Sequence, residues 1–102
     1  MSWRNQLLIM TLLATAVLVP PAVAQGVEAG YIVAQRWCSS CHEIDKGRFG
    51  NGATPSFASI ARRPSTTTVS LEMLLSNPHR RMRDSLMRHE IADVSAYILS
   101  LK

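Results

Sequence analysis

Two cysteines three positions apart, followed directly by a histidine, constrain this chain more than any other feature: Cys38-Ser39-Ser40-Cys41-His42. They are the only two cysteines in 102 residues, so disulfides cannot link distant loops. A dithiol pair of the thioredoxin type would need alternating strands and helices, and a zinc site would need a second pair of ligands. Neither is found in this sequence. Both thiols must therefore serve another chemistry.

The spacing is the attachment signature of c-type haem. Two thiols three residues apart can form thioethers with the two vinyl groups on one edge of the porphyrin, and the adjacent histidine can bind the iron. We therefore expect Cys38, Cys41 and His42 to hold one covalent haem c, with His42 as the proximal iron ligand.

The N-terminal segment has the order of a secretory signal. Arg4 precedes an apolar run over 7–19, and Ala22-Val23-Ala24 offers small residues to a signal peptidase. The run is shorter than the roughly 20 residues of a spanning helix. We expect a signal peptide over 1–24, and a single periplasmic domain without a membrane span over 25–102. The alternative, an uncleaved N-terminal anchor, also places the domain outside the cytoplasm.

A domain over 25–102 is close to the size, about 80 residues, at which a hydrophobic core alone gives marginal stability. A large apolar prosthetic group would supply the missing core. Apolar residues at helical spacing predict a helix over 27–37 that delivers the cysteines, and a charged, glycine-rich composition predicts a loop over 43–53.

Three further helices are expected in the second half of the chain. A short one over 57–62 should end before Pro64, because the residue preceding proline disfavours helical backbone. Another over 69–76 should end at Asn77-Pro78. The last is the clearest: its apolar face is formed by Ile91, Val94, Ile98 and Leu101. No segment alternates with period two, so the fold class is all-α.

With these motifs in place, 25–102 resembles a class I cytochrome c over its full length. The resemblance implies a small fold whose N- and C-terminal helices cross around one haem, with Gly30 at the crossing and Tyr97 as an aromatic of the last helix. It also implies that the Pro55 carbonyl accepts the Nδ1 hydrogen of His42, and that Phe57 packs on the haem.

The segment 78–82 resembles the distal segment of that family and implies Met82 as the sixth ligand, a sulfur that raises the reduction potential. Family members usually carry proline directly after this methionine, where Arg83 stands here. An open sixth position would instead suit a sensor or haem enzyme. Three other side chains remain as alternative ligands: His79, Met87 and Met73.

Met87 stands where a serine or threonine often precedes the last helix, three residues before Glu90. This replacement predicts no capping box at that point, and a cap at Asp84 or Ser85 instead. His89 should be solvated on the first turn of the last helix.

The exported part keeps all but one of the 11 Lys and Arg residues against seven acids, a mild positive balance. Nucleic-acid binding is disfavoured because no basic stripe with interleaved aromatics is present. Redox partner proteins, and acidic ones in particular, fit better. The basic residues with candidate roles are four around the distal segment, namely Arg80, Arg81, Arg83 and Arg88, and three that could pair a haem propionate, namely Arg48, Arg62 and Arg63.

These features favour a diffusible electron carrier, which needs no substrate pocket and is not an enzyme. Two alternatives stay open. One is a cytochrome subunit that docks permanently on a dehydrogenase or oxidase. The other is a haem sensor or enzyme with a displaceable distal ligand.

Overall fold

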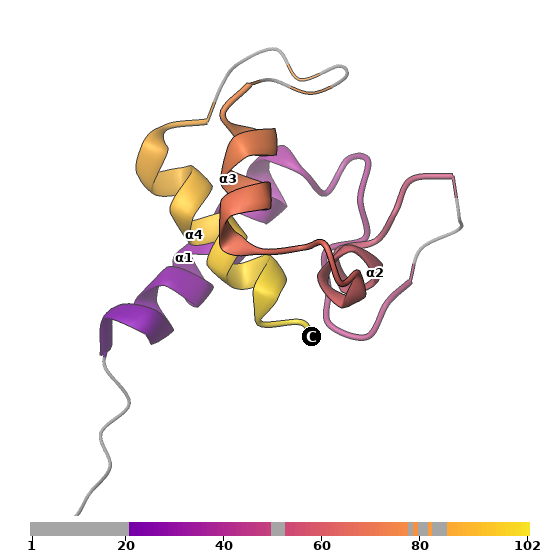
Figure 1. Cartoon of the computed structure of the whole chain (residues 1–102), viewed down its shortest axis with the longest axis horizontal. Helices are drawn as coiled ribbons and strands as arrows, with labels where there is room; N and C mark the ends of the chain where they lie inside the picture. Colours follow the sequence, from indigo (N-terminus) through magenta and orange to yellow (C-terminus); the bar gives the residue numbers. More distant parts are fainter. Residues whose placement is uncertain (1–20, 50–52, 78, 80–81, 83–85) are drawn as a thin grey trace, which may run out of the picture.

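The computed structural model describes residues 21–49, 53–77, 79, 82 and 86–102, and for 21–25 the backbone alone. Every regular element in these residues is a helix, as Figure 1 shows. No helix in this part of the chain has the length and apolarity to cross a membrane. The all-α prediction is confirmed. The four helices are α1 (Pro21–Trp37), α2 (Phe57–Arg62), α3 (Thr68–Leu75) and α4 (Arg88–Leu99).

Helices α1 and α4 cross with their backbones in direct contact at Gly30. A β-carbon placed on Gly30 would lie 2.7 Å from the Cβ atom of Tyr97 and would overlap the carbonyl group of Asp93. Only a residue without a side chain permits this approach. The close crossing expected at Gly30 is therefore confirmed, and it brings together the two ends of the folded domain.

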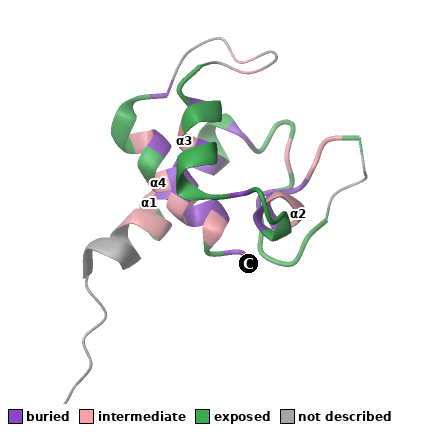
Figure 2. Ribbon diagram, viewed as in Figure 1, coloured by how far each residue is buried: buried purple, intermediate pink, exposed green. Residues whose placement is uncertain are grey.

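The hydrophobic core lies between all four helices, and Figure 2 shows buried positions on their inward faces. Ala34 and Val94 have no exposed surface, and Ile98 is 3% exposed. The loop expected over 43–53 is confirmed in its described residues, with Gly47 at a φ of 79° that favours glycine.

Side-chain caps fix the ends of the two short helices. The Ser56 hydroxyl accepts a hydrogen bond from the N–H of Ser59 at the start of α2, and Arg63 leaves the helix in an extended conformation before Pro64. Thr67 and Ser70 form a reciprocal capping box that begins α3. Helix α2 therefore has the predicted bounds, and α3 begins one residue earlier than predicted.

Two helix starts differ from the sequence predictions. Helix α1 begins at Pro21, ahead of the expected start at Val27, and proline is well suited to the first position of a helix. Helix α4 is capped at Met87, where the Glu90 carboxylate accepts the backbone N–H of Met87 at 2.9 Å. The sequence predicted no capping box here because Met87 has no hydroxyl, and Met87 indeed makes no side-chain cap hydrogen bond. The half of the box that Glu90 provides needs no hydroxyl, and this contact was not predicted.

The alternative caps, Asp84 and Ser85, lie outside the described residues, as does 1–20 of the expected signal peptide. His89 is exposed on the first turn of α4, as predicted.

Tyr97 joins α4 to the segment that follows the cysteine motif. Its hydroxyl donates to the carbonyl of Ile44 at 2.5 Å, and its ring packs edge-on against Tyr31 with centroids 5.3 Å apart. Burial raises the pKa of Tyr97, and the charges of Asp45 and Tyr31 raise it further. The folded protein therefore favours the neutral phenol more strongly than the unfolded chain does.

We expect Tyr97→Phe to lower the free energy of unfolding by about 1–2 kcal/mol at pH 7, because the buried Ile44 carbonyl loses its donor. The deficit should shrink above pH 10. The pKa of Tyr97 is higher in the folded protein than in the unfolded chain, where it is about 10. The neutral phenol therefore contributes its full stabilisation below pH 10, and this stabilisation is lost as the pH rises through the folded-state pKa. Denaturant unfolding of the haem-loaded wild type and Tyr97→Phe variant at pH 7 and pH 10.5 measures the difference in their free energies of unfolding. Tyr31→Phe, which loses only an exposed bond of 3.3 Å to Asp45, serves as control. A difference in free energy that stays constant or grows at high pH would contradict the role given to the Tyr97 hydroxyl.

Candidate functional site

The cysteine motif continues from the end of α1 as one further turn. The N–H of Cys38 donates to the carbonyl of Ala34 at 2.9 Å, and the N–H of His42 donates to the carbonyl of Cys38 at 2.9 Å. Both thiols and the imidazole are thus presented by one compact turn anchored to a buried helix.

His42 is oriented by a hydrogen bond from across the sequence. Its Nδ1 donates to the carbonyl of Pro55 at 2.5 Å. A carbonyl can only accept, so the proton must be on Nδ1 and the lone pair on Nε2. This is the tautomer in which Nε2 can bind a metal, and such a bond also raises the basicity of the ligand. It is the contact that the resemblance implied.

The segment around Pro55 is itself held in place. The N–H of Phe57 donates to the carbonyl of Glu43 at 2.9 Å, and Ser56, fully buried, caps α2. Phe57 is 4% exposed, and its ring centroid lies 5.4 Å from that of His42. The proximal histidine is therefore fixed on two sides, by a hydrogen bond and by an aromatic ring.

A cavity of about 860 Å³ opens beside this turn and is lined by Cys38, Cys41 and His42 together. Its volume lies within the range of about 300–1,000 Å³ typical of cofactor and ligand sites. Most of its remaining wall is apolar and comes from all four helices. These apolar residues are Trp37, Phe57, Ile60, Leu71, Leu74, Leu75, Val94 and Ile98.

Trp37 and Leu74 were not singled out by the sequence analysis as site residues. Both line the cavity although they are 39% and 57% exposed. Trp37 directly precedes the motif, and Leu74 belongs to the apolar pattern of α3, so helical register could have identified them. A flat apolar group in the cavity would cover both.

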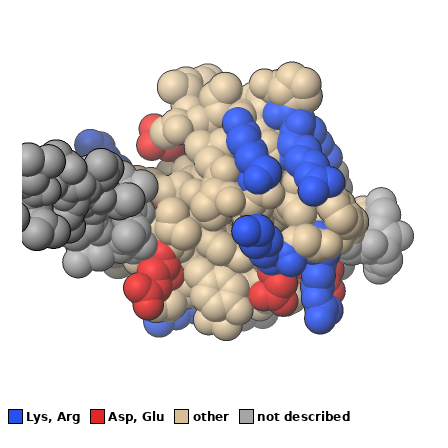
Figure 3. Space-filling view, turned by 90° about the horizontal axis from the view of Figure 1, so that it is seen from below, with Lys and Arg blue, Asp and Glu red and all other residues tan. Residues whose placement is uncertain are grey.

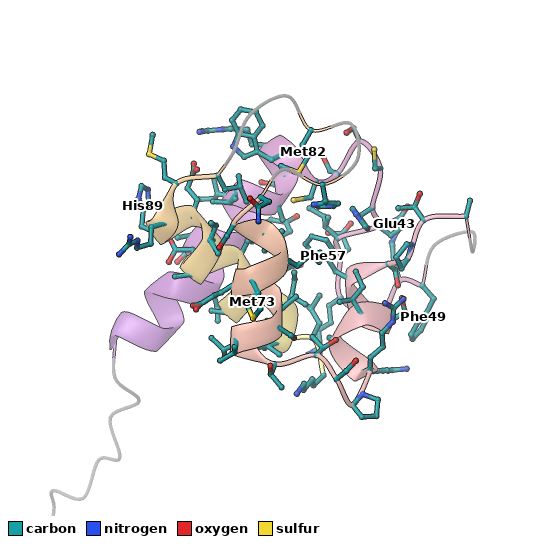
Figure 4. The ribbon with its side chains drawn as sticks, turned by 45° about the horizontal axis from the view of Figure 1, so that its top comes forward. Glu43, Phe49, Phe57, Met73, Met82 and His89 are labelled. Carbon is teal, nitrogen blue, oxygen red and sulfur yellow. The ribbon has the colours of Figure 1, made fainter. Side chains whose placement is uncertain are left out.

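The described candidates for a distal ligand fall into two groups, those that line the cavity and those that are exposed to solvent. Met82 and His79 line the cavity, and Met82 donates its backbone N–H to the carbonyl of His79 at 3.3 Å. Met73 and Met87 are 71% and 65% exposed and do not line it. Figure 4 shows Phe57 in the middle of the molecule, Met82 above it near the top of the view, and His89 at the left edge, near the start of α4.

The two cysteines differ in environment. Cys38 is buried and Cys41 is exposed, and both are free thiols. Burial raises the pKa of the Cys38 thiol to about 11, with a further contribution from Cys41, so Cys38 is a neutral thiol at pH 7. Both sulfurs line the cavity, Cys38 from the core and Cys41 from the surface.

The basic residues divide between the cavity and the surface. Arg63 and Arg36 line the large cavity, whereas Arg48 lines a smaller one of about 610 Å³ beside Cys41 and His42. Arg62 stacks its guanidinium 4.7 Å from the ring centre of Phe49. Arg36 was missed by the sequence analysis. Arg88 is exposed, and the other three arginines of the distal cluster lie outside the described residues: Arg80, Arg81 and Arg83.

The residues present fit a covalent haem. Two free thiols, a metal-competent imidazole nitrogen and a large apolar cavity meet at one place, with arginines at the cavity wall for the acidic propionates. Within the described residues, no cluster of three or more His, Cys, Asp or Glu offers a competing metal site.

Comparison with known proteins gives one informative match. Cytochrome c-552 of Bradyrhizobium diazoefficiens is 40% identical to this chain over 96 residues, which cover 92% of each protein. No protein-family model matches the chain, and no solved structure matches it. The similarity to the Bradyrhizobium protein covers nearly all of both sequences.

Proposed function

Because this chain belongs to the class I c-type cytochromes, which carry electrons on a covalently bound haem c, we propose that it is a diffusible periplasmic carrier with His42 and Met82 as axial ligands. The observation that carries the proposal is the hydrogen bond from His42 Nδ1 to Pro55 at the edge of a cavity that both cysteines and Met82 line. The haem supplies an iron centre that gains or loses one electron.

The protein's own contribution is to hold and shield that centre. The Pro55 carbonyl fixes the His42 tautomer, Cys38 and Cys41 bind the haem edge, and Phe57 packs beside the proximal ring. The apolar wall excludes water, which keeps the environment of the metal similar in both charge states. None of these roles requires a substrate pocket, in agreement with an electron carrier rather than an enzyme.

Met82 is favoured as the sixth ligand by position and by chemistry. It lines the cavity and is partly buried against the core, whereas Met73 and Met87 face solvent. A thioether sulfur raises the reduction potential relative to a second imidazole.

The proposed export rests on the N-terminal sequence. The chain begins with the pattern of a signal peptide, which we propose is cleaved after Ala24. Gly26 and Val27, which pack on the rest of the domain, both follow that point. The aligned region covers 92% of this chain and therefore includes part of 1–24.

Redox partner proteins with acidic docking surfaces complete the proposal. All seven Lys and Arg residues in the described part after residue 25 are exposed, and Figure 3 shows basic side chains gathered toward one side of the face in view. Opposite charge on a partner would accelerate encounter at low ionic strength.

We expect Met82→Ala to remove the weak long-wavelength sulfur-to-iron charge-transfer absorption while the haem stays attached, because the cysteines and not the distal ligand hold the porphyrin. Absorption spectra of the oxidised protein and its intact mass measure the two effects. Met73→Ala, which changes an exposed methionine outside the cavity, should keep the band. Persistence of the band in Met82→Ala would contradict the assignment. Tight carbon monoxide binding by the reduced wild type would favour the sensor or enzyme alternative instead.

A further inference from the structure

The cavity presents two side chains from its distal wall, and one of them has no role in the proposed function. His79 lines the cavity together with Met82, and its ring centroid lies 6.2 Å from that of His42. We propose that His79 is a reserve distal ligand, which binds the iron whenever the Met82 sulfur is displaced or missing. This proposal rests on the proposed function for the haem and for His42 as its proximal ligand.

The spacing between the two imidazoles is the first argument. A metal–imidazole bond is about 2.0–2.1 Å long, and the ring centre lies about 1.1 Å behind the bonded nitrogen, so two imidazoles on opposite sides of one metal have centroids about 6.2–6.4 Å apart. The observed 6.2 Å agrees with this value. The planes of the two rings are tilted by 56°. This angle does not conflict with binding to one metal, because each imidazole can rotate about its own bond to the metal.

The orientation of His42 is the second argument. Its Nδ1 donates to Pro55, so its metal-binding nitrogen is on the opposite side of the ring from that contact. His79 and His42 both line the one large cavity. An iron bound to His42 would therefore lie in the space that His79 also borders.

The tether between the two distal candidates is the third argument. His79 and Met82 are three residues apart, and the N–H of Met82 donates to the carbonyl of His79 at 3.3 Å. Both side chains border the same cavity, so an exchange of one ligand for the other can leave the helices that form the cavity in place. The effective concentration of such a tethered ligand is in the millimolar range or above, so it competes well with ligands from solution.

The chemistry of the exchange involves no electron transfer. One iron–sulfur bond breaks and one iron–nitrogen bond forms from the imidazole lone pair. Imidazole in place of the thioether favours the oxidised iron and lowers the reduction potential. The site stays six-coordinate, so carbon monoxide and other external ligands remain excluded from the iron.

The test compares three haem-loaded variants with the wild type: Met82→Ala, Met82→Ala with His79→Ala, and Met82→Ala with His89→Ala. His89 is the matched control, because it is an exposed histidine on α4 outside the cavity. Electron paramagnetic resonance of the oxidised proteins reports the spin state. Titration with imidazole reports how accessible the sixth position is.

We expect Met82→Ala, alone or with His89→Ala, to be low-spin with a bis-histidine signature. Adding His79→Ala should make the iron high-spin and increase its affinity for imidazole about 100-fold, since the internal competitor is gone. Saturating imidazole should return this double variant to the low-spin state, which shows that the cavity is intact.

A high-spin Met82→Ala variant would overturn the proposal, and so would a low-spin signal that survives loss of His79. Failure of the proposed function looks different. If the wild type lacks the sulfur-to-iron absorption, Met82 is not the resting ligand, and if no haem is attached, the cofactor site itself is wrong.

Discussion

Replacing Cys38 and Cys41 together with serine is expected to abolish covalent haem attachment and, with it, cooperative folding. Without the cofactor, the apolar wall of the cavity of about 860 Å³ would face water or empty space. Each large apolar side chain that loses its burial costs about 1.5–3 kcal/mol, so exposure of several of them would remove most of the total stability of about 5–15 kcal/mol of a small domain. The chain would collapse or unfold rather than keep this shape.

Intact mass under denaturing conditions, visible absorption and thermal unfolding followed by circular dichroism measure these effects. Ser39→Ala with Ser40→Ala is the matched control, because both serines are exposed within the same motif. It should keep the haem and change the free energy of unfolding by less than about 0.5 kcal/mol. A double cysteine variant that unfolds cooperatively without haem would show that the cofactor is not part of the core.

Gly30→Val should lower the free energy of unfolding by about 3 kcal/mol or more. A Cβ atom at this position overlaps the Asp93 carbonyl and lies 2.7 Å from the Tyr97 Cβ, and both belong to the rigid α4 helix. The helices would have to separate, which opens the interface on which the core depends. Denaturant unfolding of the haem-loaded protein gives the change in free energy.

Gly26→Ala is the matched control in the same helix. A Cβ atom on Gly26 would lie 3.7 Å from an Asp93 carboxylate oxygen and 3.9 Å from the Ala96 Cβ, which is ordinary contact. Its effect should stay within about 1 kcal/mol and favour stability, because alanine forms helix more readily than glycine. Equal effects at the two glycines would refute the close crossing as the cause.

The sequence predicted best the parts of the site whose chemistry is local. Cys38, Cys41 and His42 lie within five consecutive residues, so the prediction of a shared cofactor follows from their spacing alone. The bounds of α2 were predicted because a serine cap and a downstream proline act within a few residues. The contact between His42 and Pro55 joins segments thirteen residues apart, and only the resemblance to a family predicted it.

Features that depend on tertiary packing were predicted less well. Arg36 and Trp37 line the cavity because the last turn of α1 runs along its edge, and composition does not reveal that position. The competition between His79 and Met82 depends on which side chains reach the same space. Met73 was a candidate for the sixth ligand because it is a methionine, and only its exposure on α3 argues against that role.

The crossing of α1 and α4 also imposes an order in time. Gly30 meets residues of the final helix, so the cavity has no complete wall until segments about 60 residues apart in the sequence have come together. Closing so long a loop is slow compared with forming a single turn. The five residues from Cys38 to His42, by contrast, form one local turn at the end of α1. A haem attached to that turn before α4 closes would give the later helices an apolar surface to pack against.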